Sequence, residues 1–176
     1  MDFDLQPTLT GEHLVLRPLR TDDLEALWEV ARDPLIWEQH PDQTRHTRPG
    51  FERFFADAVA GGALAVVDRA SGRIIGSTRF YEWEPDVREV AIGYTFLARE
   101  FWGGAANREM KQLLIRHAAP HVHAIWFHVG KNNLRSRRAM EKIGGHAALE
   151  TQRQQNGEMI DFIYYRIEPA RWPAQP

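Results

Sequence analysis

The sequence contains no cysteine, which excludes a disulfide framework, a thiolate nucleophile and any metal site built on cysteine. It also lacks a long apolar run. The longest stretch without Asp, Glu, Lys or Arg covers residues 117–130 and contains four histidines, so it does not read as a membrane span. The first residues, MDFDLQP, lack the apolar core of a signal peptide. We therefore expect a cytoplasmic protein with no membrane partner.

What the chain does contain is typical of a globular protein. Its 176 residues are 43% hydrophobic and 11% aromatic, which predicts one domain spanning residues 1–176. The net charge of −2 is unevenly distributed, because residues 99–142 hold nine Lys or Arg against three Asp or Glu. This basic segment suits a polyanionic ligand, although solvated helix faces would give the same count.

The pattern of apolar residues predicts an α/β domain with a mixed sheet and flanking helices. A helix capped by Thr21 follows the first strand, residues 34–49 are expected to be loop-rich, and the residues after Trp172 are expected to form a tail. Residues 124–129 read as a strand buried on both faces, and Asn156-Gly157 marks a hairpin. The predicted strands cover residues 13–17, 63–67, 74–80, 87–97 and 124–129, and the predicted helices cover 24–31, 51–60, about 103–118 and 133–143.

The segment FWGGAANR, residues 101–108, indicates an anion site. A strand ends just before it and an amphipathic helix begins inside it, so its small residues leave backbone N–H groups exposed at a helix N-terminus. Arg108 and Lys111 add positive charge to the first turns. A plain glycine turn is the alternative.

A second informative segment is NLRSRRAMEKIG, residues 133–144. Ser136 falls on the same helical stripe as Met140 and Ile143, so its hydroxyl either bonds a carbonyl one turn earlier or faces a ligand. In the second case Asn133 caps the helix and offers its amide to the ligand. The nearby arginines form too short a run for a nucleic-acid surface, and we expect no nucleic-acid partner; they are Arg135, Arg137 and Arg138.

Three further groups of residues have less specific patterns. The histidines suggest a metal site, but Pro120 separates one of them from the rest and no carboxylate lies nearby, so we expect no metal. The acidic turn before the 87–97 strand either attracts a cationic amine or is solvated, and the aromatic residues either line a pocket or belong to the core. These groups are His117, His121, His123 and His128; Glu82, Glu84, Asp86 and Glu89; and Trp28, Trp37, Tyr81 and Trp83.

Taken in order, these segments resemble the GNAT superfamily of acyl-CoA N-acyltransferases, and within it the RimJ/RimL-like branch. The resemblance rests on LTGEHLVLRPLRTDDLEALW, VAIGYTFLAREFWGGAANREMKQLLIRHA, IWFHVGKNNLRSRRAMEKIG and the C-terminal hairpin. It implies a mostly antiparallel mixed sheet that opens between residues 90–97 and 124–129, with acetyl-CoA as co-substrate in the opening. It further implies direct transfer of the acetyl group to a primary amine, either a protein N-terminus or a small amine, and often a homodimer.

The same resemblance implies a set of site residues. The backbone of Phe96, Leu97 and Ala98 would pair with the pantetheine arm, and Asn133 and Ser136 would lie near the sulfur. The pyrophosphate would be held by the loop and helix start, which comprise Trp102, Gly103, Gly104, Ala105, Ala106, Asn107, Arg108 and Lys111.

The usual acid and base of the family are replaced in this sequence. Met140 stands where many members have a tyrosine, and Ala91 stands where many have a glutamate. On chemical grounds we therefore expect Ser136 to assist the departing sulfur and Glu89, or Glu82, to accept the amine proton through water. The replacements also leave open a non-catalytic acyl-CoA-binding or sensor module, and the histidines leave open a metal-dependent hydrolase.

Overall fold

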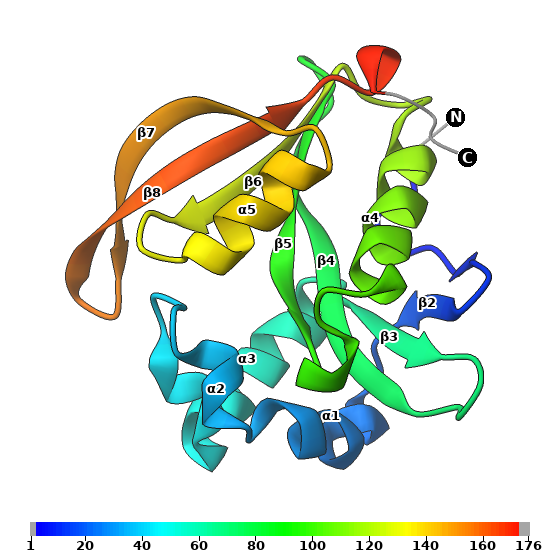
Figure 1. Ribbon diagram of the computed structural model, residues 1–176, viewed down its shortest axis with the longest axis vertical. Helices are drawn as coiled ribbons and strands as arrows, with labels where there is room; N and C mark the ends of the chain where they lie inside the picture. The colour runs from blue at the N-terminus through cyan, green and yellow to red at the C-terminus, as the bar shows by residue number, and fades with distance from the viewer. Residues whose placement is uncertain (1–2, 173–176) are drawn as a thin grey trace.

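The computed structural model describes residues 3–172, and its strands form one eight-stranded mixed sheet (Figure 1). The strand order is β1-β2-β3-β4-β5-β6-β8-β7, and every neighbouring pair is antiparallel except β5 and β6. The predicted α/β class with a mixed, mostly antiparallel sheet is confirmed. The strands are β1 (Leu9–Thr10), β2 (Leu14–Pro18), β3 (Leu64–Asp68), β4 (Ile74–Glu84), β5 (Glu89–Leu97), β6 (Ala124–Gly130), β7 (His146–Gln155) and β8 (Glu158–Ile167).

Helices pack on both faces of this sheet. α4 and α5 lie on one face, and α1, α2 and α3 gather on the other, at the lower end of Figure 1. None of the helices within residues 3–172 is long and apolar enough to cross a membrane. The helices are α1 (Leu24–Ala31), α2 (Pro34–Trp37), α3 (Arg48–Ala60), α4 (Ala105–Ala118) and α5 (Leu134–Lys142), with 3₁₀ turns at Thr21–Asp23, Gln43–His46, Arg99–Phe101 and Pro169–Arg171.

β5 and β6 are paired over only a short distance. Their parallel register joins residues 89–91 to residues 124–126, and beyond that point the two strands diverge (Figure 1). Tyr94 of β5 has a positive φ of 52°, and the register between β4 and β5 shifts between Ser77 and Arg79, which identifies a β-bulge. The expected opening between the two strands is confirmed.

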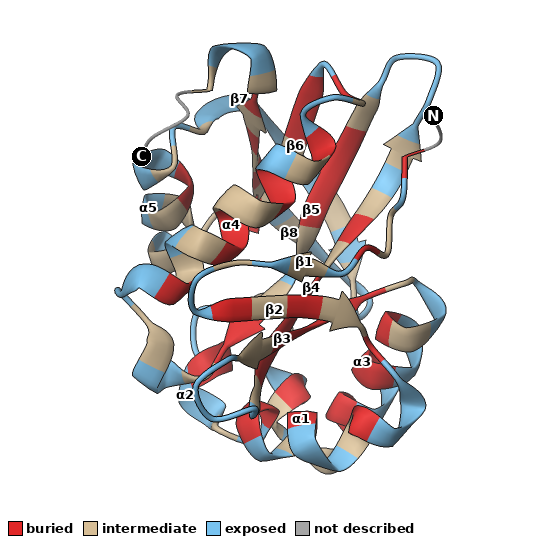
Figure 2. Cartoon of the chain, turned by 90° about the vertical axis from the view of Figure 1, so that its right-hand side faces the viewer, coloured by how far each residue is buried: buried red, intermediate tan, exposed pale blue. Residues whose placement is uncertain are grey.

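Two hydrophobic clusters hold the helices to the sheet. Met110 and Leu114 of α4 pack with Val90 and Ile92 of β5 on one face. On the other face, Phe96 of β5 packs with residues of α1, α2 and α3. Figure 2 shows the buried residues concentrated at these two contacts, whereas β7 is mostly exposed. Helices therefore pack against both faces of β5.

Most predicted elements form, with local differences. Asn156 and Gly157 have φ values of 51° and 83° and join β7 to β8, which confirms the hairpin. The β6 prediction was wrong on burial, because Trp126 and His128 are only partly buried on the face opposite α4.

The N-terminal third departs further from expectation. Thr21 begins a 3₁₀ turn and α1 starts at Leu24, so Thr21 does not cap that helix. The loop-rich stretch at residues 34–49 contains α2 and the start of α3, because Pro34 and Pro49 occupy first-turn positions, where a missing N–H costs nothing. β1 was not predicted. The expected tail after Trp172 lies outside the described residues.

Gly76 offers a test of the packing beneath the open end of β5. A Cβ atom at this position would lie 2.1 Å from the carbonyl oxygen of Phe96, a backbone atom that cannot move aside. Gly76→Ala is therefore expected to lower the free energy of unfolding by about 1–3 kcal/mol in urea denaturation. Gly104→Ser is the control, because no atom lies within 4 Å of its Cβ position and serine suits an N-cap; equal losses in both variants would contradict the packing argument.

Candidate functional site

A cavity of about 840 Å³ occupies the opening between β5 and β6. Its walls come from segments far apart in the sequence. They are α2 and the loop after it (Ile36, Trp37, Gln39, His40), the end of β5 and the loop into α4 (Thr95, Phe96, Leu97, Trp102, Gly103, Gly104), α4 itself (Asn107, Arg108, Lys111, Gln112), α5 with its flanks (Asn133 to Ser136 and Arg138 to Gly144) and Trp172.

The N-terminus of α4 forms one rim of this cavity. Gly103 adopts a left-handed φ of 67°. Gly104 is the N-cap of α4 and has no side chain that could hydrogen-bond to the first amides of the helix. The first amides of α4 therefore keep their N–H groups for an external acceptor, and Arg108 is exposed on the next turn. Together with the helix dipole, these groups make the rim suited to phosphate.

Two contacts fix the position of this rim. The Glu109 carboxylate of α4 accepts hydrogen bonds from the backbone N–H groups of His13 and Leu14, at 2.9 and 3.2 Å. The Trp102 indole Nε1 donates to the carbonyl oxygen of Leu97 at 2.9 Å. The loop between β5 and α4 is thus hydrogen-bonded to β5, while α4 is hydrogen-bonded to the start of β2.

The backbone of β5 is directed into the opening only at alternate residues. The Ala98 N–H donates to Ile75 of β4 at 2.8 Å, and the Ala98 carbonyl accepts from Phe101. Since hydrogen-bonded pairs alternate in an antiparallel ladder, Phe96 also bonds β4, whereas Leu97 faces the β6 side. Of the three backbone positions expected to pair with a pantetheine arm, the register therefore directs only Leu97 into the opening.

Arg135 joins three walls of the cavity. Its guanidinium lies 3.8 Å from the centre of the Trp102 ring and donates through Nη2 to the Ile36 carbonyl at 2.9 Å. Its backbone N–H donates to Gln39 Oε1 at 3.1 Å. Arg137 instead bonds the hydroxyl of Tyr165, so the arginines of α5 do not face one common surface. This role was not predicted, because its partners are distant in sequence.

The start of α5 contributes Asn133 and Ser136. The Asn133 side-chain oxygen accepts from the Ser136 N–H at 3.2 Å, which confirms the cap. Within residues 3–172 the Ser136 hydroxyl makes no bond to a carbonyl one turn earlier, and both residues line the cavity. Met140, two turns into α5, is buried and also lines the cavity.

Lys111 lies at the inner end of the cavity and is 3% exposed. Its Nζ is 3.4 Å from Thr95 Oγ1 on β5 and 5.0 Å from the centre of the Phe127 ring on β6. No ion pair to it is found among the described residues. Burial alone lowers the pKa of this amine from 10.5 to about 7, because a charged ammonium there is poorly solvated.

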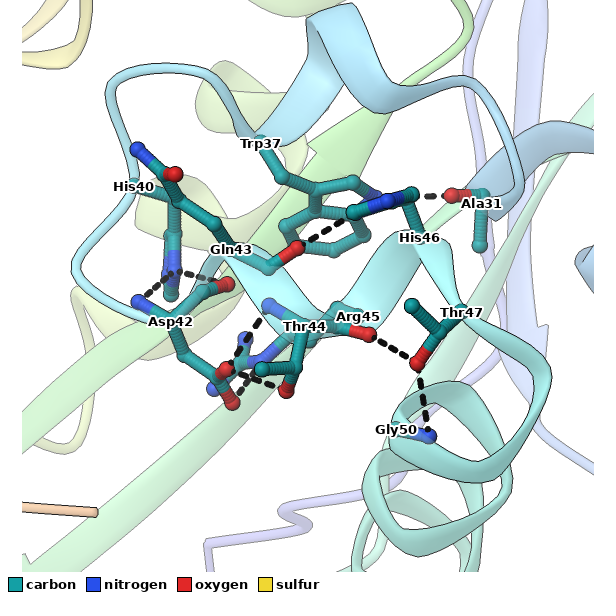
Figure 3. Close-up of polar contacts among 10 residues, drawn as sticks. All are labelled: Ala31, Trp37, His40, Asp42, Gln43, Thr44, Arg45, His46, Thr47 and Gly50. Atoms are coloured by element: carbon teal, nitrogen blue, oxygen red, sulfur yellow. Dashed lines mark hydrogen bonds and ion pairs between the residues drawn. The ribbon is translucent and has the colours of Figure 1, made fainter.

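In the wall formed by α2 and the following loop, Trp37 was the one residue predicted as a candidate for lining a pocket. His40 Nδ1 accepts from the Asp42 N–H at 2.9 Å, and Asp42 also receives a bond from Arg45 (Figure 3). Burial, followed by the charge of Arg45, lowers the pKa of His40 to about 3, so its ring is neutral. Pro41 packs on Gly130 of β6, which brings this loop across the opening. Of the four aromatic candidates, Trp37 lines the cavity, and it is also a core residue.

Several predicted residues lie elsewhere. Glu89 is at the closed end of β5, where its Oε2 accepts from Trp126 Nε1 at 2.8 Å, and it does not line the cavity. Glu82 pairs with Arg153 at 2.9 Å. Three of the expected ligand-binding alanines also fall outside the lining: Ala98, Ala105 and Ala106.

The histidines do not gather at one point. His117 bonds the Asp4 carbonyl at 2.7 Å, whereas His128 bonds the Tyr81 hydroxyl at 2.9 Å on the other face of the sheet. Over the described part of the chain, the histidines and carboxylates include no group of three or more that could hold a metal ion.

A family model described as the acetyltransferase (GNAT) domain matches residues 13–146. The chain therefore belongs to the GNAT acetyltransferases, which transfer an acyl group from a coenzyme A thioester. A comparison with curated proteins found no match.

Solved structures of GNAT proteins share the fold. A GCN5-related N-acetyltransferase from Brucella melitensis superposes with a TM-score of 0.87 at 19% identity, covering 98% of this chain and 83% of that one. A GNAT-family acetyltransferase from Bacillus anthracis gives 0.74 at 18%, covering 94% and 100%. A spermidine N-acetyltransferase from Vibrio cholerae, in complex with CoA and spermine, gives 0.71 at 18%, covering 92% and 99%. At these identities the likeness concerns the fold.

Removing the buried amine is expected to stabilise the protein in a pH-dependent way. Below about pH 7 both the folded and the unfolded chain carry a protonated Lys111, so the full cost of burial is present; the cost disappears as pH rises toward 10.5. At about 1.4 kcal/mol per pKa unit, Lys111→Met should raise the free energy of unfolding by several kcal/mol near pH 6 and by less near pH 9. Urea denaturation at both pH values measures this difference. A gain that is equal at both would be inconsistent with a buried, titrating amine.

Proposed function

We propose that this protein is an acetyl-CoA-dependent N-acetyltransferase that transfers the acetyl group to a primary amine. The observation that carries the proposal is the cavity at the opening between β5 and β6, with unpaired helix amides at its rim. Membership of the GNAT family supports acyl transfer from a coenzyme A thioester. The Asn133-x-x-Ser136 pattern supports assignment to the RimJ/RimL-like branch.

The residues of the cavity fit coenzyme A. The amides at the start of α4 and Arg108 would hold the pyrophosphate. The lining also includes Arg135, Arg138 and Lys142, with Glu141 as its single carboxylate among the described residues, so the local charge favours a polyanion. The Leu97 N–H would pair with the pantetheine arm, and Asn133 and Ser136 would lie near the sulfur.

Acetyl transfer requires a neutral amine to attack the thioester carbon, so that a C–N bond forms and the C–S bond breaks. A backbone N–H of β5 near the bulge would polarise the carbonyl. Ser136 Oγ would donate a hydrogen bond to the departing sulfur. The amine nitrogen must also lose a proton, and Glu89 is not assigned this role because Trp126 binds its carboxylate outside the cavity.

A second candidate function is a non-catalytic module that binds acyl-CoA. It is motivated by Met140 in the cavity wall and Ala91 on β5, which replace the tyrosine and glutamate common in the family. The two candidates differ in turnover: the module binds the thioester but releases no free thiol when amines are added. The panel should contain spermidine, which the named Vibrio cholerae neighbour acetylates, and a peptide with an N-terminal serine.

Binding of the co-substrate tests the α4 rim directly. Calorimetric titration with acetyl-CoA should give a Kd of about 1 μM, near −8 kcal/mol, and Gly104→Leu should abolish it by filling the space in front of the helix amides. The variant should fold, since no atom lies within 4 Å of the Gly104 Cβ position. Ala119→Leu is the control, because Ala119 is exposed at the opposite end of α4 and does not line the cavity. Wild-type binding that survives in Gly104→Leu would refute the rim as the phosphate site.

Loss of the Ser136 hydroxyl tests the assistance given to the sulfur. Ser136→Ala is expected to lower kcat by roughly 10- to 1,000-fold, because a hydrogen bond made only as the thiolate departs stabilises the transition state alone. The measurement is thiol release with whichever amine of the panel is accepted. KM for acetyl-CoA should change little. An unchanged kcat would remove Ser136 from the reaction.

A further inference from the structure

We propose that Lys111 is the acid that protonates the departing thiolate. The inference rests on the proposed acetyl transfer and adds a catalytic residue to it. It starts from the position of the amine between Thr95 of β5 and Phe127 of β6, beyond the last paired residues of the two strands and in the wall of the cavity.

The surroundings of Lys111 are those of a reactive amine rather than of a structural ion pair. Its hydrogen bond to Thr95 Oγ1 is long, and Thr95 Oγ1 is itself 2.8 Å from Thr78 Oγ1. The Phe127 ring offers the ammonium only a weak electrostatic contact. A buried ammonium with no carboxylate partner is costly, so a sequence that keeps one there retains it at the expense of stability.

The charged groups around the cavity do not neutralise this amine. Most of the titratable residues that face the cavity are basic, and the one carboxylate among the described lining residues, Glu141, accepts from the Tyr165 hydroxyl at 3.4 Å. These residues are His40 on the loop after α2, Arg108 on α4, and Arg135, Arg138, Glu141 and Lys142 on α5. The protonation of Lys111 is therefore governed by its burial.

Partial protonation near neutral pH is what proton transfer to sulfur needs. A thiol has a pKa near 8.5 in water, so an ammonium that titrates near pH 7 gives up its proton to a thiolate readily. The Ser136 hydroxyl can hydrogen-bond the sulfur, but it is a much weaker acid than a thiol and cannot leave it protonated. Met140, at the position of the usual tyrosine, has no proton to give.

The proton balance closes within one turnover. As the C–S bond breaks, the Lys111 ammonium passes a proton to the thiolate, which leaves a neutral amine and a free thiol. The new amide nitrogen carries an extra proton after the attack, and neutral Lys111 recovers a proton from it, directly or through water. Lys111 thus returns to its starting state, and the overall reaction of amine and thioester gives amide and thiol with no other reactant.

The test measures the thiol of bound coenzyme A, and it requires no acceptor amine. Thiolate absorbance near 240 nm is followed as pH rises, with protein in excess over coenzyme A and with desulfo-coenzyme A as the baseline. Because an ammonium stabilises a neighbouring thiolate, thiolate should begin to form at lower pH in the wild-type protein than in Lys111→Met, and the apparent pKa of the bound thiol should be lower. Lys131→Met, which removes a lysine outside the cavity, should titrate like the wild type.

The outcomes separate this inference from the proposed function. Equal thiol pKa values in wild-type protein and Lys111→Met, with coenzyme A bound to both, would overturn the role of Lys111 and leave the proposed function intact. Failure of the wild-type protein to bind coenzyme A would overturn the proposed function and this inference with it. Lys111→Gln is a second variant without charge, and a thiol pKa in it that matches the one in wild-type protein would likewise overturn the role of Lys111.

Discussion

The separation of β5 and β6 after three residue pairs is the constraint on which the remaining features of the site depend. Beyond Ala91, alternate residues of β5 expose backbone groups that have lost their ladder partner, and such groups must find other partners or face a ligand. The Trp102 indole satisfies the carbonyl of Leu97. The Lys111 amine of α4 lies over the Phe127 ring of β6, one residue beyond the last pair of the two strands. The cavity is thus a direct product of incomplete strand pairing, stabilised by a bulge at Tyr94.

This geometry explains why a chain with a small negative net charge has a basic site. Most acidic residues lie outside residues 99–142, and several of them form ion pairs with basic residues, such as Glu82 with Arg153. The basic residues of α4 and α5 border one opening, where two helices approach from the same face of the sheet. Since a ligand responds to the local field, the net charge of the chain says little about its partner.

Local signals predicted much of the site, and contacts between distant segments account for what was missed. The glycines before α4 and the Asn133 cap act within one turn of chain, so their spacing alone identifies them. The partners of Arg135 lie in the loop before α4 and in α2, and nothing in its own segment indicates them.

Two other differences between the predicted and the observed site can be explained from the positions of the residues in their elements. The burial of Lys111 could have been found, because it precedes Leu114 and Ile115 by three and four residues and so shares their buried stripe. Glu89 was chosen for its chemistry, but its place at the start of β5 puts it at the end of the strand where pairing is intact.

Arg135 links the positions of two walls of the cavity. One side chain bonds the carbonyl of Ile36 and stacks on Trp102, so the segment that crosses the opening and the loop that precedes α4 cannot shift independently. Through this one guanidinium, the loop at the start of α4 and the wall opposite it form a single mechanical unit, so that a displacement of either one is resisted by contacts of the other.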